Sequence, residues 1–145
     1  MKLIPIKPKG KLFDIPRIER AVKQGMRAAG EEAVSILEGY TKGWSKPPTF
    51  EVVAVSDGVI VGTDDEIFGY VDEGTKPHVI VPRKAKVLRF NPHGGNGASG
   101  GAVFTKRVNH PGTAPRDYTG KALKQVQDAL PTIIASYLDP ALGAD

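Results

Sequence analysis

Residues 15–40, IPRIERAVKQGMRAAGEEAVSILEGY, carry apolar side chains at intervals of three and four residues. This spacing places them on one stripe of an amphipathic α-helix. The stripe consists of Ile15, Ile18, Val22, Met26, Ala29, Ala33, Ile36, Leu37 and Tyr40. Asp14 is suited to cap the first turn, Pro16 is tolerated there, and Gly43 is suited to end the helix. The sequence therefore predicts a long N-terminal helix with one face to bury.

Two glycines, Gly25 and Gly30, lie inside this helix. Each lowers helix stability by about 1 kcal/mol relative to alanine. Close packing against a neighbouring element would explain both glycines, and simple tolerance would explain them equally well.

After the helix, the apolar period changes to two, which indicates strands. Segments 49–56 (TFEVVAVS) and 59–63 (VIVGT) flank Asp57-Gly58, a dipeptide that favours a tight hairpin turn. Further strands are expected at 78–82, 86–90 and 102–108. The stretch 91–101, NPHGGNGASGG, has no large apolar side chain and is expected to be a mobile loop.

Helical spacing returns over 115–130, PRDYTGKALKQVQDAL, and Pro131 is expected to end or kink this helix, with 132–138 continuing it. The predicted fold class is α+β: the long N-terminal helix packs on an antiparallel β-sheet that carries an extended basic β-hairpin, and a C-terminal helix follows. The 145 residues suit one domain over 14–138, with an N-terminal extension (1–13) and a C-terminal tail (139–145). No internal repeat is apparent.

The net charge of +4 conceals two adjacent blocks of opposite sign. Residues 47–75 contain seven acidic side chains and no basic one, whereas residues 76–116 contain eight Lys or Arg and no acid. Such blocks suit either solvated faces or a surface that meets its opposite. The first thirteen residues lack the apolar run of a signal peptide and no later segment suggests a membrane span, so we expect assembly in a cytoplasm and no membrane partner.

Two patterns in the sequence could indicate a cofactor or metal site, but the residues around each of them argue against such a site. The glycines of 95–100 (GNGASG) match a dinucleotide motif, but the β-branched and basic residues after them do not predict the required helix. His78, His93 and His110 are too far apart in sequence to suggest a metal site, and hydrogen bonding to turn backbone is the expected role of His78 and His110. We therefore expect no enzyme, no cofactor and no metal.

The basic block could also contact nucleic acid. Its side chains suit phosphate neutralisation without base recognition, while Phe90 and Phe104 are equally suited to a core. A monomeric, sequence-independent nucleic-acid-binding module is therefore an open alternative. A small hydrolase is another; it would need a cleft around the carboxylates of 64–66 or 72–73.

An aromatic-x-x-Glu-Gly-Thr element, a basic hairpin that contains proline and a His-Pro-Gly turn follow one another from residue 70 onward. Their positions are Tyr70, Glu73, Gly74, Thr75, Pro82, Leu88, Phe90, His110, Pro111, Gly112 and Pro115. The order of these short motifs resembles the neck or tail-completion proteins of long-tailed bacteriophages, the minor tail-component family that joins heads to tails, and the resemblance covers about 15–138. The longer glycine loop and the N-terminal extension depart from the family pattern.

The resemblance implies a structural virion protein that forms a ring, expected to have six subunits, around the DNA channel at the head-tail junction. It implies contacts with the head connector or stopper, with the tail terminator or tail tube, and non-specific contacts with packaged DNA. The expected subunit interface comprises Tyr70, Asp72, Glu73, Gly74, Thr75, Lys84 and Lys86. The side chains expected to face the DNA or a partner are Arg83, Arg89, Lys106, Arg107 and His110.

Within the corner at 70–75, Gly74 is expected to adopt a backbone conformation that other residues resist. This conformation would let Tyr70 pack inward while Glu73 and Thr75 face a neighbouring subunit.

Overall fold

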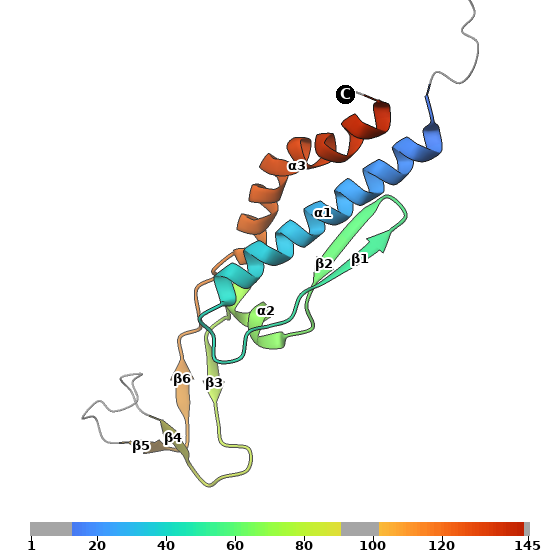
Figure 1. Cartoon of the computed structure of the whole chain (residues 1–145). Helices are drawn as coiled ribbons and strands as arrows, with labels where there is room; N and C mark the ends of the chain where they lie inside the picture. Colours follow the sequence, from blue (N-terminus) through green and yellow to red (C-terminus); the bar gives the residue numbers. More distant parts are fainter. Residues whose placement is uncertain (1–12, 91–101, 144–145) are drawn as a thin grey trace, which may run out of the picture. The chain divides into compact units, whose positions relative to one another are not determined.

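The computed structural model describes residues 13–90 and 102–143 and shows an α+β fold (Figure 1). The glycine-rich stretch 91–101, for which the sequence predicts mobility, lies outside the described residues, as do 1–12 and 144–145. The chain divides into two compact units. Unit 1 comprises Met1–Asp65 and Tyr118–Asp145, and unit 2 comprises Glu66–Asp117.

Unit 1 contains two long helices and one β-hairpin. The helices are α1 (Ile15–Thr41) and α3 (Tyr118–Leu142), and the hairpin pairs β1 (Glu51–Val55) with β2 (Gly58–Gly62). The predicted N-cap is confirmed, since the Asp14 carboxylate accepts a hydrogen bond from the Arg17 backbone N–H (3.2 Å). The hairpin turn is Ser56-Asp57, one residue earlier than predicted, because Gly58 already pairs with Val55.

The end of α1 is formed without a left-handed glycine. Gly43 is not among the residues with positive φ, and the helix has already ended at Thr41. The Thr41 side chain is fully buried, and its hydroxyl donates to the Leu37 carbonyl oxygen (3.1 Å). The Trp44 backbone N–H in turn donates to the Thr41 carbonyl (2.9 Å). A buried hydroxyl and a following turn therefore contribute to this helix end, and Gly43, which directly follows the C-cap residue Lys42, does so without a left-handed conformation.

Helix α1 packs against both α3 and the β1–β2 hairpin, so its apolar stripe is buried on two sides (Figure 1). The most buried side chains of unit 1 are mainly small: Ala21, Ala29, Leu37 and Ala122. Gly25 and Gly30 are both buried at these contacts. A Cβ at position 25 would lie 2.8 Å from Ile134 Cδ1, and a Cβ at position 30 would lie 2.8 Å from Val52 Cγ1. Close packing, rather than tolerance, therefore explains both glycines.

We expect Gly30→Ala to lower the melting temperature of the protein, although alanine is the better helix former. The new methyl group would collide with Val52, whose branched side chain has little rotamer freedom. Gly39→Ala is the matched control, because a Cβ at position 39 would have no atom within 4 Å and the substitution should stabilise α1 by up to about 1 kcal/mol. Thermal unfolding followed by circular dichroism would measure both; equal stabilisation by the two variants would contradict close packing at Gly30.

Helix α3 is continuous through Pro131 and Pro140. Of the two effects predicted for Pro131, an end of the helix is excluded, and the predicted continuation over 132–138 is confirmed. The helix reaches Leu142, where the sequence predicted a separate tail from residue 139. Its first turn is held on α1 by aromatic stacking, since the rings of Tyr118 and Tyr40 have centroids 5.0 Å apart and an interplanar angle of 13°. The amide of Gln125 also donates to the Tyr40 hydroxyl (2.6 Å).

Unit 2 consists of a short helix and two small antiparallel ladders. Helix α2 (Glu66–Asp72) is followed by β3 (His78–Ile80), which pairs with β6 (Val108–His110); between them in the chain, β4 (Leu88–Phe90) pairs with β5 (Val103–Thr105). One ladder thus follows the other along an extended hairpin. We call this segment, residues 75–90 and 102–113, the arm.

The sequence predicted one strand over 102–108, and this prediction is wrong. The structure has two strands, β5 and β6, that are separated at Lys106-Arg107. At this break the Thr105 hydroxyl donates to the Arg107 carbonyl (2.9 Å) and accepts from the Arg107 N–H (3.3 Å). A threonine side chain thereby replaces the ladder hydrogen bonds at this point.

Candidate functional site

All of the interface and partner-facing residues that the sequence singled out lie in unit 2. They fall on helix α2, at the base of the arm and along the arm itself. They are Tyr70, Asp72, Glu73, Gly74, Thr75, Arg83, Lys84, Lys86, Arg89, Lys106, Arg107 and His110.

The base of the arm is a crossing of two closely similar short motifs. Residues 74–77 read Gly-Thr-Lys-Pro and residues 112–115 read Gly-Thr-Ala-Pro. The two threonines, Thr75 and Thr113, form an isolated antiparallel bridge through reciprocal backbone hydrogen bonds of 2.9 and 3.0 Å. The sequence-based prediction missed this pairing, and the repeated Gly-Thr-x-Pro pattern is the signal that could have found it.

Both glycines of the crossing have left-handed backbone conformations. Gly74 has φ 74° and Gly112 has φ 87°, so the conformation predicted for Gly74 is confirmed. Each glycine also lies against the opposite threonine: a Cβ at position 74 would be 2.5 Å from the Thr113 carbonyl oxygen, and a Cβ at position 112 would collide with that of Thr75. The crossing therefore requires glycine at both positions, for conformation and for space.

The predicted inward packing of Tyr70 is wrong, since its side chain is 57% exposed. The sequence-based prediction missed α2, in which Phe68 and Asp72 are four residues apart and share the buried face. Tyr70, midway between them, faces the opposite side of the helix.

Asp72 and Thr75 are less exposed than Tyr70 and Glu73. Asp72 is buried, and its backbone carbonyl accepts from the Asp117 N–H (3.1 Å), next to a similar bond from Arg116 to Val71 (3.0 Å). The Thr75 hydroxyl oxygen is buried and has no hydrogen-bond partner among the described residues. Of the corner residues, Glu73 and Tyr70 remain exposed and accessible to another molecule.

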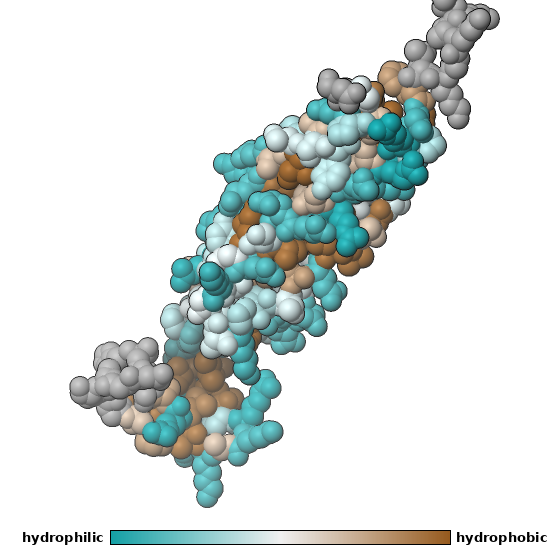
Figure 2. Space-filling model, viewed as in Figure 1, coloured by the Kyte–Doolittle hydropathy of each residue, from teal (hydrophilic) through white to brown (hydrophobic). Residues whose placement is uncertain are grey.

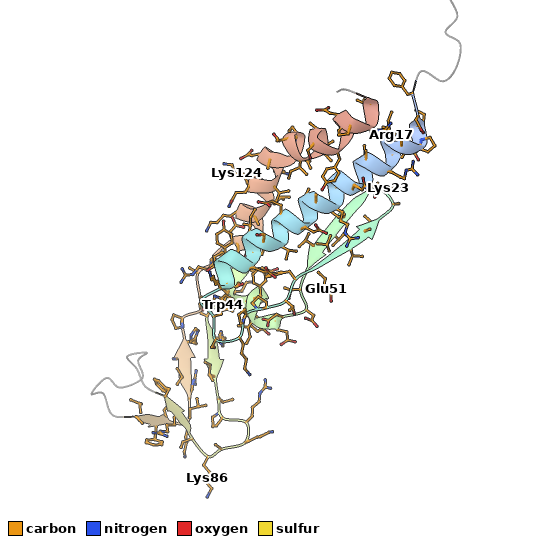
Figure 3. All side chains as sticks on the ribbon, in the orientation of Figure 1. Arg17, Lys23, Trp44, Glu51, Lys86 and Lys124 are labelled. Atoms are coloured by element: carbon orange, nitrogen blue, oxygen red, sulfur yellow. The ribbon has the colours of Figure 1, made fainter. Side chains whose placement is uncertain are left out.

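The basic side chains of the arm gather where the two ladders meet. Ile80 pairs with Val108 and Leu88 pairs with Thr105, so residues 81–87 on one strand lie opposite only Lys106-Arg107 on the other. Arg83, Lys84 and Lys86 lie on the longer side of this discontinuity, and the Lys86 side chain points away from the ribbon (Figure 3). These three side chains are exposed, and so are those of Lys106 and Arg107.

The arm also exposes apolar side chains, and Figure 2 shows hydrophobic residues gathered over β3 and β6. Every residue of β3 is exposed. Phe90 and Phe104 are exposed as well, Phe104 to 63%, so the interpretation of these two rings as core is wrong. By register, Phe104 pairs with Arg89 and therefore shares a face of the ladder with it. The arm thus combines cations with solvent-exposed apolar groups.

His78 and His110 face each other across β3 and β6, with ring centroids 5.0 Å apart. The Nδ1 of His78 donates to the Lys76 carbonyl oxygen (2.8 Å), and the Nδ1 of His110 accepts from the Gly112 N–H (3.1 Å). The predicted role of both histidines in bonding turn backbone is confirmed. Within residues 13–90 and 102–143, no group of three or more His, Cys, Asp or Glu side chains is placed to hold a metal ion.

No family model, curated protein or solved structure matches this chain. The resemblance to tail-completion proteins therefore depends on the motifs alone. In the part of the chain that the structure describes, no helix has the length and apolarity needed to cross a membrane.

Proposed function

We propose that this chain is a structural virion protein that forms a ring, of about six subunits by its resemblance to the tail-completion family, at the head-tail junction of a tailed bacteriophage. The observation that carries the proposal is the arm, a basic and acid-free ribbon with exposed apolar side chains and no core of its own among the described residues. Virion assembly would take place in the host cytoplasm, and the ring would join the connector or stopper to the tail terminator or tail tube.

An arm of this kind needs a partner to become rigid. Its ladders have two strands of three residues each, and an isolated two-stranded ladder is at best marginally stable in water. Burial of Val79, Val81 and Phe104 against another surface would supply the missing stabilisation. These exposed groups support an assembling protein over a catalytic one.

The distribution of charge supports assembly between copies of the same chain. A heterologous ring places one face of each subunit against a different face of the next. The acidic block 47–75 of one subunit and the basic block 76–116 of the next would supply opposite charges at every such contact. Basic side chains that are not used in this contact would face the DNA in the channel.

We expect Lys84→Glu with Lys86→Glu to prevent ring formation while leaving the fold intact. Each exposed pair contributes only about 0.2–1 kcal/mol, but the repulsion is repeated at every interface of the ring. Glu73→Lys is the reciprocal change, and combining it with the lysine variants should restore part of the assembly. Asp72 is unsuitable for this test because it is buried. Native mass spectrometry and head-tail joining assays would measure the outcome.

The matched control is Lys23→Glu with Lys124→Glu, which makes the same change in net charge on exposed positions of α1 and α3 (Figure 3). This control should assemble like the parent protein. If the Lys84/Lys86 variant also assembles but its particles retain or eject DNA abnormally, these lysines face the channel instead. Normal assembly and normal DNA retention in every variant would show that the two charge blocks are only solvated surface.

Sequence-independent nucleic-acid binding is the second candidate function, and the exposure of Phe104 on the same face as Arg89 favours it. Stacking of a base on an aromatic ring contributes about 1–3 kcal/mol. We therefore expect Phe104→Ala to weaken binding of a labelled single-stranded oligonucleotide by roughly tenfold or more, and binding to fall steeply with salt. Phe13→Ala, at a similarly exposed ring outside the arm, is the control. Fluorescence anisotropy that shows no binding at low salt would exclude this candidate.

A further inference from the structure

The β1–β2 hairpin of unit 1 has a second apolar face that the described residues leave open. Val52 and Val59 point toward α1, since their methyl groups lie next to Gly30. Side chains alternate along a strand, so Val53, Val55 and Ile60 lie on the opposite face. All three are exposed, Ile60 to 57%, and Val53 pairs directly with Ile60 across the ladder.

The two strands have the apolar composition of strands that are buried on both faces. The runs 52–55 (VVAV) and 59–61 (VIV) are apolar without interruption, a pattern typical of strands that are buried on both sides. Among the described residues of unit 1, α1 covers one side of the hairpin and nothing covers the other. The outer face of the hairpin is therefore an apolar surface that the described residues of unit 1 do not cover.

The outer face is also hollow and acidic. Val53 and Ile60 line a shallow depression of about 300 Å³, in which Gly62 contributes no side chain. Glu51, Asp64 and Thr49 also line it, and none of the described lining residues is basic. Apolar side chains beside carboxylates repel nucleic acid and suit a ligand that carries an apolar group beside a cation.

The arm carries such a pair. Phe104 and Arg89 share one face of the β4–β5 ladder, and no acidic residue occurs anywhere in 76–116. We infer that the outer face of the hairpin is the docking site for the arm of a second copy of this chain, with Phe104 on Val53 and Ile60 and with Arg89 toward Glu51 and Asp64. The inference rests on the proposed ring, and it names the two surfaces that form each contact.

We assign the docking site on the hairpin to a second copy of the chain because every chain contains one arm and one such site. Each subunit then offers one arm and receives one arm, which is the arrangement that a heterologous ring requires. The acceptor lies in unit 1 and the arm in unit 2, so a single subunit uses two different surfaces.

Site-directed cross-linking tests this contact, and the absence of cysteine in the chain makes it specific. Thr49→Cys places a thiol in the lining of the acceptor, and Lys106→Cys places one beside β5, while Phe104, Arg89, Val53 and Ile60 are kept. The two single-cysteine proteins are mixed and treated with a bismaleimide, so that any heterodimer must join two copies. Ser35→Cys, exposed on α1, replaces Thr49→Cys in the control mixture.

Because docking raises the effective concentration of the two thiols, we expect about tenfold or more covalent dimer with Thr49→Cys than with Ser35→Cys. Phe104→Ala in the Lys106→Cys protein, or Glu51→Lys with Asp64→Lys in the Thr49→Cys protein, should reduce the yield to that of the control.

The alternatives give different results. A ring detected by native mass spectrometry without enrichment of the Thr49–Lys106 dimer would overturn this contact and leave the proposed function standing. If neither a ring nor an enriched dimer is detected, both the docking contact and the proposed function are overturned. A chain that carries both cysteines and cross-links only within itself on dilution would show that the arm occupies its own hairpin, and this would overturn the second copy as the occupant.

Discussion

Leu37→Asp is expected to abolish the folded state of unit 1. Leu37 is only 4% exposed and lies on the stripe of α1 that is buried by the other elements of the unit. The substitution removes a buried apolar side chain and buries a carboxylate, with an expected cost of about 4–5 kcal/mol or more. This is comparable to the whole free energy of unfolding of a small domain, about 5–15 kcal/mol. Far-ultraviolet circular dichroism should show loss of helix at 25 °C.

Leu123→Asp is the matched control on α3. Leu123 is 58% exposed, so the same change in chemistry should cost only the difference in helix propensity, within about 1 kcal/mol. A native spectrum and an unchanged melting temperature for Leu37→Asp would refute the packing of α1. Equal unfolding in both variants would show that the exposed Leu123 is also buried in solution.

Gly74→Ala is expected to open the base of the arm without unfolding unit 1. The left-handed conformation alone costs alanine about 1–2 kcal/mol. The added methyl group would also stand 2.5 Å from the Thr113 carbonyl oxygen and 2.8 Å from the Pro115 nitrogen, so the two strands must separate. Hydrogen exchange should then accelerate at the amides of Thr75 and Thr113, whereas the amides of α1 should keep their protection.

Gly69→Ala, five residues earlier in α2, controls for the chemistry of the substitution. The φ of Gly69 is not positive and a Cβ at this position would have no atom within 4 Å, so alanine should be neutral or stabilising there. Unchanged protection of Thr75 and Thr113 in Gly74→Ala would disprove the requirement for glycine at the crossing.

The elements with a strong periodic signal were predictable. The stripe over 15–40 extends through about seven turns, and the cap at Asp14 marks its start, so α1 was placed to within a residue at each end. The hairpin was found because two β-branched runs flank a turn dipeptide. Both patterns are local, so they can be recognised in the sequence without knowledge of tertiary contacts.

Helix α2 and the break between β5 and β6 were harder to predict because neither has a periodic signal in the sequence. Helix α2 is seven residues long and offers too few turns for a periodic pattern to emerge. The split between β5 and β6 depends on a hydroxyl that replaces ladder bonds, which composition does not reveal. The charge pattern indicated which residues to consider for the candidate surfaces. The burial of Asp72 and the exposure of Tyr70 follow from helix α2, which the sequence-based prediction did not contain.

The position of α3 in the chain has a consequence for biosynthesis. Helix α1 precedes unit 2, whereas its packing partner α3 follows unit 2. A ribosome therefore releases α1 and the hairpin first, then the whole arm, and only afterwards the helix that covers the remaining apolar stripe. Contacts between segments so distant in sequence form slowly, and the uncovered stripe is exposed throughout that interval. The arm is thus synthesised before unit 1 is complete.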